Sequence, residues 1–289
     1  MLWNKARRSK NVNDIRKGKD ARTLTGTTLA AGLAAVALAS VGLYSTLDTP
    51  ADATKLEPSY TPDRPLPQPS IETEVDLQLT FVQSVLGDTE DTWNQLFAQM
   101  GRQYPHPTLT LFNNGVVSGC GFASSGSGPF YCPGNRQVYL DLEFFRTLEQ
   151  QFSVVGDFAR AYIIAHEIGH HVQLGLGLSA PFEKALLEQQ PASGDGGLEV
   201  RAELQADCLA GVWAHHAQQR LDWLEPGDIE AALHAAAMFG DDQLQAARNA
   251  QIRPETFSHG TSLQRVNWFK TGFATGLPEA CETFAADVL

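Results

Sequence analysis

Cysteine and basic side chains are both scarce in this sequence of 289 residues, and each shortage excludes a class of protein. The four cysteines include no C-x-x-C pair, which excludes the usual zinc-ribbon pattern. Lysine and arginine number 21 against 33 acidic residues, giving a formal net charge of -12, and we therefore expect no nucleic-acid partner. With 43% hydrophobic residues, most of the chain is expected to be globular.

Charge is missing altogether from residues 23–47, where Leu, Ala, Val and Gly dominate. The 22 residues before this run hold eight basic and two acidic side chains, whereas the rest of the chain holds 13 basic and 31 acidic ones. About 20 apolar residues suffice for a helix to cross a bilayer, and basic flanks stay in the cytoplasm. We therefore expect a basic cytoplasmic segment (1–22), a single transmembrane helix (23–47) and an extracytoplasmic remainder. The alternative is a signal peptide cleaved after Ala37-Leu38-Ala39.

Proline is concentrated in residues 48–70, which we expect to form an extended linker. The domain that follows covers residues 71–289. Apolar spacing predicts that it starts with a helix, which Gly87-Asp88 interrupts. Short strands are predicted at 109–112 and 136–142. Longer helices are predicted at 143–152, 157–173, 198–219 and 229–239.

The four cysteines are expected to form two disulfides, because an even number in an exported domain favours oxidised pairs. Three pairings are possible for four cysteines. Proximity in the sequence favours Cys120–Cys132 and, by remainder, Cys208–Cys281.

The clearest chemical motif is His166-Glu167-Ile168-Gly169-His170. On a helix, residues four apart lie on one face, so the two imidazoles can share one metal ion. Zinc binds imidazole nitrogen, and a carboxylate directly after the first histidine can act as the general base of a metallopeptidase. The plainer alternative is a pair of surface histidines that bind no metal.

A catalytic zinc usually has three protein ligands and one open position. Glu203, on the next long helix, is the best candidate for the third ligand, and Glu199, one turn earlier, is its rival. Asp207 lies on the same face as Glu203 and can accept the outer N–H of a ligand histidine. Charged residues on a helix also occur simply as a solvated face, which is the competing interpretation.

His259 is a further candidate, since a histidine near the metal can stabilise the oxyanion of a tetrahedral intermediate. A structural role for this side chain is equally compatible with the sequence.

Taken together, the motifs resemble the bacterial neutral zinc metallopeptidase family, whose members are membrane-anchored. The resemblance runs nearly end to end and rests on residues 7–12, 118–121, 128–133, 138–142, 165–173, 203–213 and 258–265. The order of these motifs is also similar to that of gluzincins such as thermolysin. In those enzymes a glutamate ligand follows the paired histidines, and an aspartate four residues later supports a histidine. These resemblances imply zinc as the cofactor and peptide hydrolysis as the reaction.

We therefore expect an α+β, zincin-like and helix-rich domain with a small β-sheet. The predicted reaction is hydrolysis of peptide bonds outside the cytoplasm, with zinc held by His166, His170 and Glu203. Glu167 is the predicted base, Asp207 orients a ligand and His259 assists the oxyanion. The alternative function is an inactive, membrane-tethered binding module in which zinc only ties two helices together.

Overall fold

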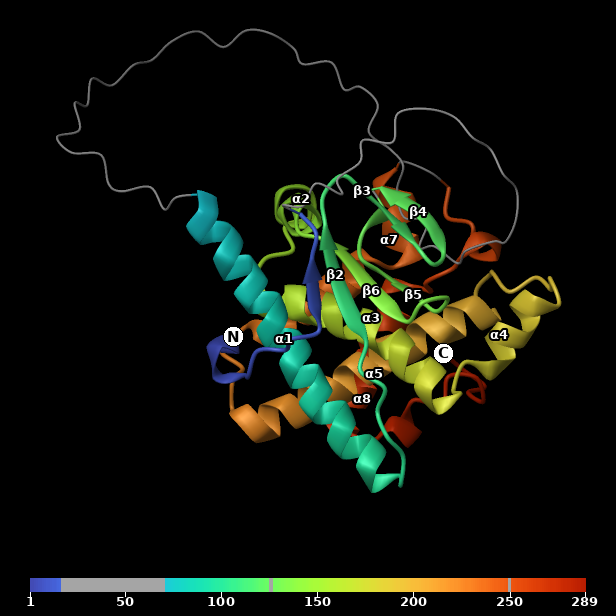
Figure 1. Cartoon of the computed structure of the whole chain (residues 1–289). Helices are drawn as coiled ribbons and strands as arrows, with labels where there is room; N and C mark the ends of the chain where they lie inside the picture. Colours follow the sequence, from blue (N-terminus) through green and yellow to red (C-terminus); the bar gives the residue numbers. More distant parts are fainter. Residues whose placement is uncertain (17–70, 125–126, 249–250) are drawn as a thin grey trace, which may run out of the picture.

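Residues 1–16, 71–124, 127–248 and 251–289 are described by a computed structural model (Figure 1). The transmembrane helix predicted at 23–47 and the linker predicted at 48–70 lie outside these residues. Among the helices within the described ranges, none is both long enough and apolar enough to cross a membrane. The prediction of a helix-rich α+β domain with a small sheet is confirmed.

Eight α-helices make up most of the described structure. They are α1 (Ile71–Gln99), α2 (Glu143–Phe152), α3 (Asp157–Leu176), α4 (Ala180–Leu187), α5 (Leu198–Leu221), α6 (Asp228–Met238), α7 (Asp241–Ala247) and α8 (Ser262–Thr275). Short 3-10 turns occur at η1 (Trp3–Lys5), η3 (Pro254–Thr256) and η4 (Pro278–Ala280). The sequence predicted α2, α3, α5 and α6 to within a few residues at each end.

A four-stranded mixed sheet lies against α3, with strand order β1-β2-β6-β5. The central strands β2 (Thr108–Phe112) and β6 (Gln137–Asp141) are parallel, and they correspond to the two predicted strands. At one edge, β1 (Val12–Asp14) runs parallel to β2. At the other edge, β5 (Phe130–Cys132) runs antiparallel to β6 and contacts α3; its three residues are buried. Separately, β3 (Gly115–Ser118) and β4 (Gly121–Ser124) form a hairpin.

Residues 1–16 pack against α1 and β2 in the described structure (Figure 1). The side chain of Trp3 contacts Phe81 of α1, with ring centroids 5.9 Å apart, and β1 extends the sheet. The sequence predicted this basic segment as a part separate from the domain, because its charge was interpreted as a membrane-topology signal. Its side chains instead make specific contacts with the domain.

The break predicted at Gly87-Asp88 is wrong, because α1 continues without interruption from Ile71 to Gln99. A Cβ atom on Gly87 would lie 2.3 Å from the carbonyl oxygen of Arg7. This distance is too short for any side chain to fit at this position. Glycine is therefore required here by the close passage of the N-terminal segment, and not by a bend in the helix.

The metal-binding motif lies in the interior because α3 is buried between the sheet and α5. The α3 side chains Phe158 and Ile168 are fully buried in the main hydrophobic core. A Cβ atom on Gly169 would stand 2.9 Å from the carbonyl oxygen of Ala206 on α5. The small residue between Glu167 and His170 thus lets the two ligand-bearing helices approach each other closely.

Both expected disulfides are present, joining Cys120 to Cys132 and Cys208 to Cys281. The first ties the turn between β3 and β4 to the edge strand β5. The second ties α5 to the C-terminal segment that follows η4.

Candidate metal centre

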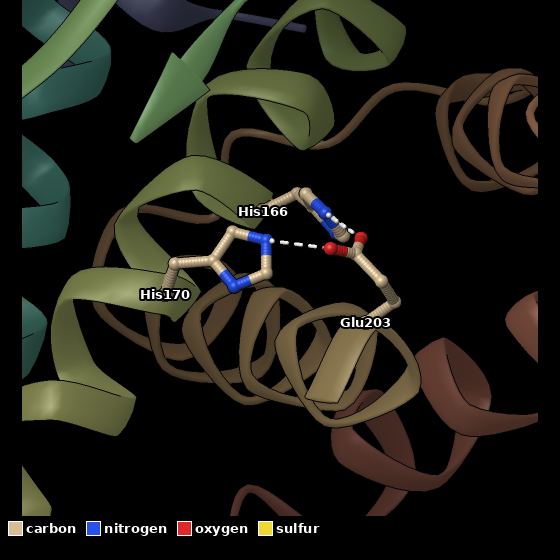
Figure 2. Close-up of side chains that lie close together, drawn as sticks. All are labelled: His166, His170 and Glu203. Atoms are coloured by element: carbon tan, nitrogen blue, oxygen red, sulfur yellow. Dashed lines mark hydrogen bonds and ion pairs between the residues drawn. The ribbon is translucent and has the colours of Figure 1, made fainter. Parts of the chain in front are cut away.

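His166, His170 and Glu203 come together in the interior, where α3 faces α5 (Figure 2). One donor atom from each of them lies within 4.8 Å of the other two. The Nε2 atom of His166 is 3.1 Å from Oε2 of Glu203, and Nε2 of His170 is 3.4 Å from Oε1. Burial opposes ionisation of Glu203, but the two histidines outweigh it and hold the pKa of its carboxyl well below the usual range. The three side chains thus form one charged, water-poor donor group.

Asp207 supports this group through a hydrogen bond to the outer nitrogen of His166. It is fully buried, and its Oδ1 lies 2.8 Å from Nδ1 of His166. Arg265 of α8 donates to both carboxylate oxygens, at 2.8 and 3.0 Å, and the Tyr162 hydroxyl donates at 2.5 Å. Burial raises the pKa of Asp207, but Arg265 and His166 outweigh it and lower the value to about 2. The ionised carboxylate fixes the proton of His166 on Nδ1, which leaves Nε2 as the ligand atom.

Gln173 plays the corresponding part for His170, and the sequence assigned it no such role. Its Oε1 lies 2.9 Å from Nδ1 of His170. Its amide nitrogen donates to the carbonyl of Ala202 and to Oε1 of Gln205. Gln205 in turn donates to the carbonyl of Cys281, which belongs to the second disulfide. The spacing of three residues between His170 and Gln173 on one helix was the available signal.

Glu167 is buried, with 3% of its surface exposed, and its Oε2 has no hydrogen-bond partner within the described part of the chain. Burial raises the pKa of its carboxyl, against the opposing charges of His166 and His170, while the backbone N–H of Tyr131 on β5 lowers it. A buried acceptor that finds no protein partner is costly and calls for an explanation.

His259 lies beside this group and is held by a residue that the sequence did not indicate. Asp241, the first residue of α7, accepts from the backbone N–H of His259 at 2.6 Å, and its Oδ1 lies 3.2 Å from Nδ1 of the ring. Ser258 Oγ also lies 2.9 Å from Nδ1. All hydrogen bonds of the ring within the described residues are thus made through Nδ1, and Nε2 is left for a ligand. No helical spacing connects Asp241 with His259, so only the folded chain brings them together.

A cavity of about 470 Å³, including the part open to solvent, connects these groups. His166, Glu167, His259 and Arg265 form its polar wall. Besides Gly128 and Tyr162, the rest of the lining forms an apolar wall that consists of Pro129, Phe144, Ile163, Phe239 and Leu244. The candidate base and the candidate oxyanion partner therefore face the same space.

The family model described as "Putative neutral zinc metallopeptidase" matches residues 1–284. The chain belongs to this family. The resemblance found in the sequence is thereby confirmed, and zinc is the metal that the family's description names.

Relatives of the chain include proteins that carry no functional name. The chain is 40% identical over 294 residues to the uncharacterized protein YpfJ of Escherichia coli strain K12, and the match covers 100% of both chains. It is 43% identical over 216 residues to uncharacterized proteins of Mycobacterium bovis and Mycobacterium tuberculosis, covering 71% of this chain and 72% of each relative. No solved protein structure matches the chain.

The donor group suits the zinc of this family. Two imidazole nitrogens and one carboxylate are a recognised catalytic zinc set, and the outer nitrogen of each histidine is already held by an oxygen. Glu199, the rival ligand, lies one turn before Glu203 and is not part of the converging group. Burial and the nearby charge of Glu203 raise the pKa of Glu199 to about 7, which weakens it further as a ligand.

Replacing Glu203 with alanine is expected to lower zinc affinity by more than the roughly 10–100-fold that loss of an outer hydrogen-bond partner costs, because one of the converging donors disappears. Competition with a fluorescent chelator measures this change. The matched variant Glu199→Ala should hold zinc as the wild type does. Full zinc retention in Glu203→Ala together with loss in Glu199→Ala would transfer the ligand role to Glu199.

Proposed function

We propose that the protein is a zinc-dependent peptidase in which Glu167 is the general base. The observation that carries the proposal is the free, buried Oε2 of Glu167 beside the converging donors of His166, His170 and Glu203. A zinc ion that only joined two helices would leave this buried carboxylate without a purpose. Structural zinc sites are also more often closed by four Cys or His ligands, whereas this set has three converging donors, of which His166 lines a cavity together with Glu167.

His166, His170 and Glu203 would hold the ion. When bound, zinc supplies Lewis acidity that activates water and polarises a peptide carbonyl. The Oε2 atom of Glu167 would accept a proton from the attacking water, and Glu167 would then pass this proton to the departing amine. The raised pKa of the Glu167 carboxyl favours both steps, since a base with a pKa nearer neutrality also returns the proton readily.

Because Asp241 accepts the proton on Nδ1, His259 would donate a hydrogen bond from Nε2 to the oxyanion that forms on the carbonyl when both ring nitrogens carry a proton. Asp241 and Ser258 hold the ring through Nδ1 and so aim the other nitrogen at the cavity. Arg265 is less available for this role, because its guanidinium already donates two hydrogen bonds to Asp207 and one to the carbonyl of Phe239.

The apolar wall of the cavity favours substrates with an apolar side chain next to the cleaved bond. Burying a Leu or Phe side chain there would contribute about 1.5–3 kcal/mol of binding free energy. The proposal also includes a location outside the cytoplasm, which the two disulfides support. Neither property follows from the names of the relatives.

The experiment that tests the function is digestion of a broad peptide library by the full chain, read by mass spectrometry. We expect cleavage that stops when a chelator removes zinc and returns when zinc is added back, because the proposed reaction needs the Lewis acidity of a metal ion held by the donor group. Cleaved bonds should have an enriched Leu, Phe or Ile on one side, about 10-fold or more over Asp or Glu at that position.

The matched control for selectivity is Leu244→Asp, which adds a charge to the apolar wall without touching the donor group. Its zinc content should be unchanged, while its preference for apolar residues falls. Chelator-insensitive cleavage would contradict zinc dependence, and an unchanged preference in Leu244→Asp would remove this wall from substrate recognition.

A further inference from the structure

The N-terminal residues are threaded into the metal-binding domain as a structural part of it. The backbone N–H of Leu109 donates to the carbonyl of Asn11 at 2.9 Å, and that of Ile15 donates to the carbonyl of Leu111 at 3.0 Å. Strand β1 is thereby paired in register with β2, with Val12 opposite Leu109. Such pairing forms a regular ladder, unlike a loose contact between two surfaces.

The carboxylate of Glu90 on α1 depends on this segment for its partners. Glu90 is 1% exposed. It accepts hydrogen bonds from Ser9 Oγ at 2.7 Å, Asn11 Nδ2 at 2.6 Å and Arg7 Nη2 at 2.7 Å. A buried, ionised carboxylate is strongly unfavourable without partners, and residues 7–11 supply the hydrogen bonds that compensate Glu90 in this position.

A second anchor joins the segment to the helix that carries the metal ligands. Trp3 donates its indole N–H to Asp157, the first residue of α3, at 3.0 Å. Lys5 donates to the carbonyl of Asp222 at the end of α5 at 2.5 Å. Residues 1–16 therefore contact α1, the sheet and the ends of both ligand-bearing helices.

Gly87 shows that α1 is shaped for this contact. The chain passes so closely at Arg7 that a Cβ on Gly87 would lie 2.3 Å from its carbonyl oxygen, and Ser9 donates its backbone N–H to Gln83 at 2.8 Å. In a helix free of this contact, glycine would only cost stability relative to alanine. The family model also matches the chain from residue 1, so the segment belongs to the matched pattern.

We propose that residues 1–16 and the metal centre lie on the same side of any membrane to which the protein is attached. A chain that crosses a bilayer once places its two flanks on opposite sides, which would prevent the contacts of Glu90, Trp3 and β1. The basic charge of the segment serves contacts such as that of Arg7 with Glu90 and Asp91, and it is not a topology signal. This proposal does not depend on catalytic activity.

The first test is labelling of single added cysteines in the full chain with a membrane-impermeant maleimide. Lys10→Cys reports on the N-terminal segment and Leu187→Cys on the domain, because both side chains are exposed. The wild type, whose four cysteines are all paired, measures the background. We expect both variants to react in the same orientation of membrane vesicles, right-side-out or inverted. Reaction in opposite orientations would overturn the proposal.

The second test uses Gly87→Ala in the full chain kept in its membrane, without solubilisation, and measures Tm. If residues 7–9 are docked, the added methyl group collides with the Arg7 carbonyl and lowers Tm. If the segment lies across a membrane from α1, alanine improves the helix and raises Tm. The two arrangements thus predict shifts of opposite sign, and a raised Tm would overturn the proposal.

Discussion

Replacing Glu167 with glutamine is expected to lower kcat for peptide hydrolysis by about 10²–10⁴-fold while zinc content stays unchanged. The amide has the same size as the carboxylate and can still accept from the backbone N–H of Tyr131. It has no basic oxygen to take a proton from water, and it is not among the converging metal donors. Zinc analysis and single-turnover kinetics on one peptide substrate measure the two properties separately.

The control is Glu230→Gln, an equivalent change on the exposed surface of α6, which should leave both properties as in the wild type. Equal turnover by wild type and Glu167→Gln would show that another group is the base. If neither protein cleaves any member of a broad library although both hold zinc, the enzyme proposal fails and the binding module takes its place.

Asp207→Asn is expected to be the most destabilising substitution in the site, lowering the free energy of unfolding by about 3–5 kcal/mol. The change leaves Arg265, which is 3% exposed, without its charged partner in the interior. It also places an amide beside Nδ1 of His166, which no longer fixes the proton there. Zinc affinity should therefore fall by roughly 10–100-fold in addition.

Urea unfolding in the presence of a chelator measures the first effect without any contribution from zinc, and chelator competition in native buffer measures the second. Arg265→Met with Asp207→Leu is an informative companion, since removing both charges avoids the unpaired one. An Asp207→Asn protein as stable as the wild type would mean that the Arg265 pair contributes nothing to the fold. In that case the role of Asp207 would be limited to the orientation of His166.

The sequence predicted the centre of the site because helical spacing is a local property. His166 and His170 lie four residues apart on α3, and Glu203 and Asp207 lie four apart on α5, so each pair shares a face wherever its helix packs. That the two faces meet is a tertiary fact, which the close approach at Gly169 allows. The role of Asp241 could not be predicted from the sequence, because its contact with His259 depends on how the start of α7 packs against the segment before α8.

The edges of the sheet were missed for a different reason. Strands β1 and β5 have three residues each, too few for an alternating pattern to be visible. The glycine in α1 resembled a helix break because its true cause, the passage of Arg7, lies 80 residues away in the sequence. The charge in residues 1–16 is typical of a membrane-topology signal, and no local feature of the sequence indicated the contacts of these residues with the domain.

The docking of residues 1–16 has a consequence for biosynthesis. These residues leave the ribosome before the rest of the described domain, yet β1 has no strand to pair with until β2 has been made, and Trp3 has no acceptor until α3 begins at Asp157. The contact of Lys5 with the carbonyl of Asp222 waits for the end of α5. Through most of translation the segment must therefore remain unpaired and open to proteases, and the domain is completed only when the beginning of the chain returns to it.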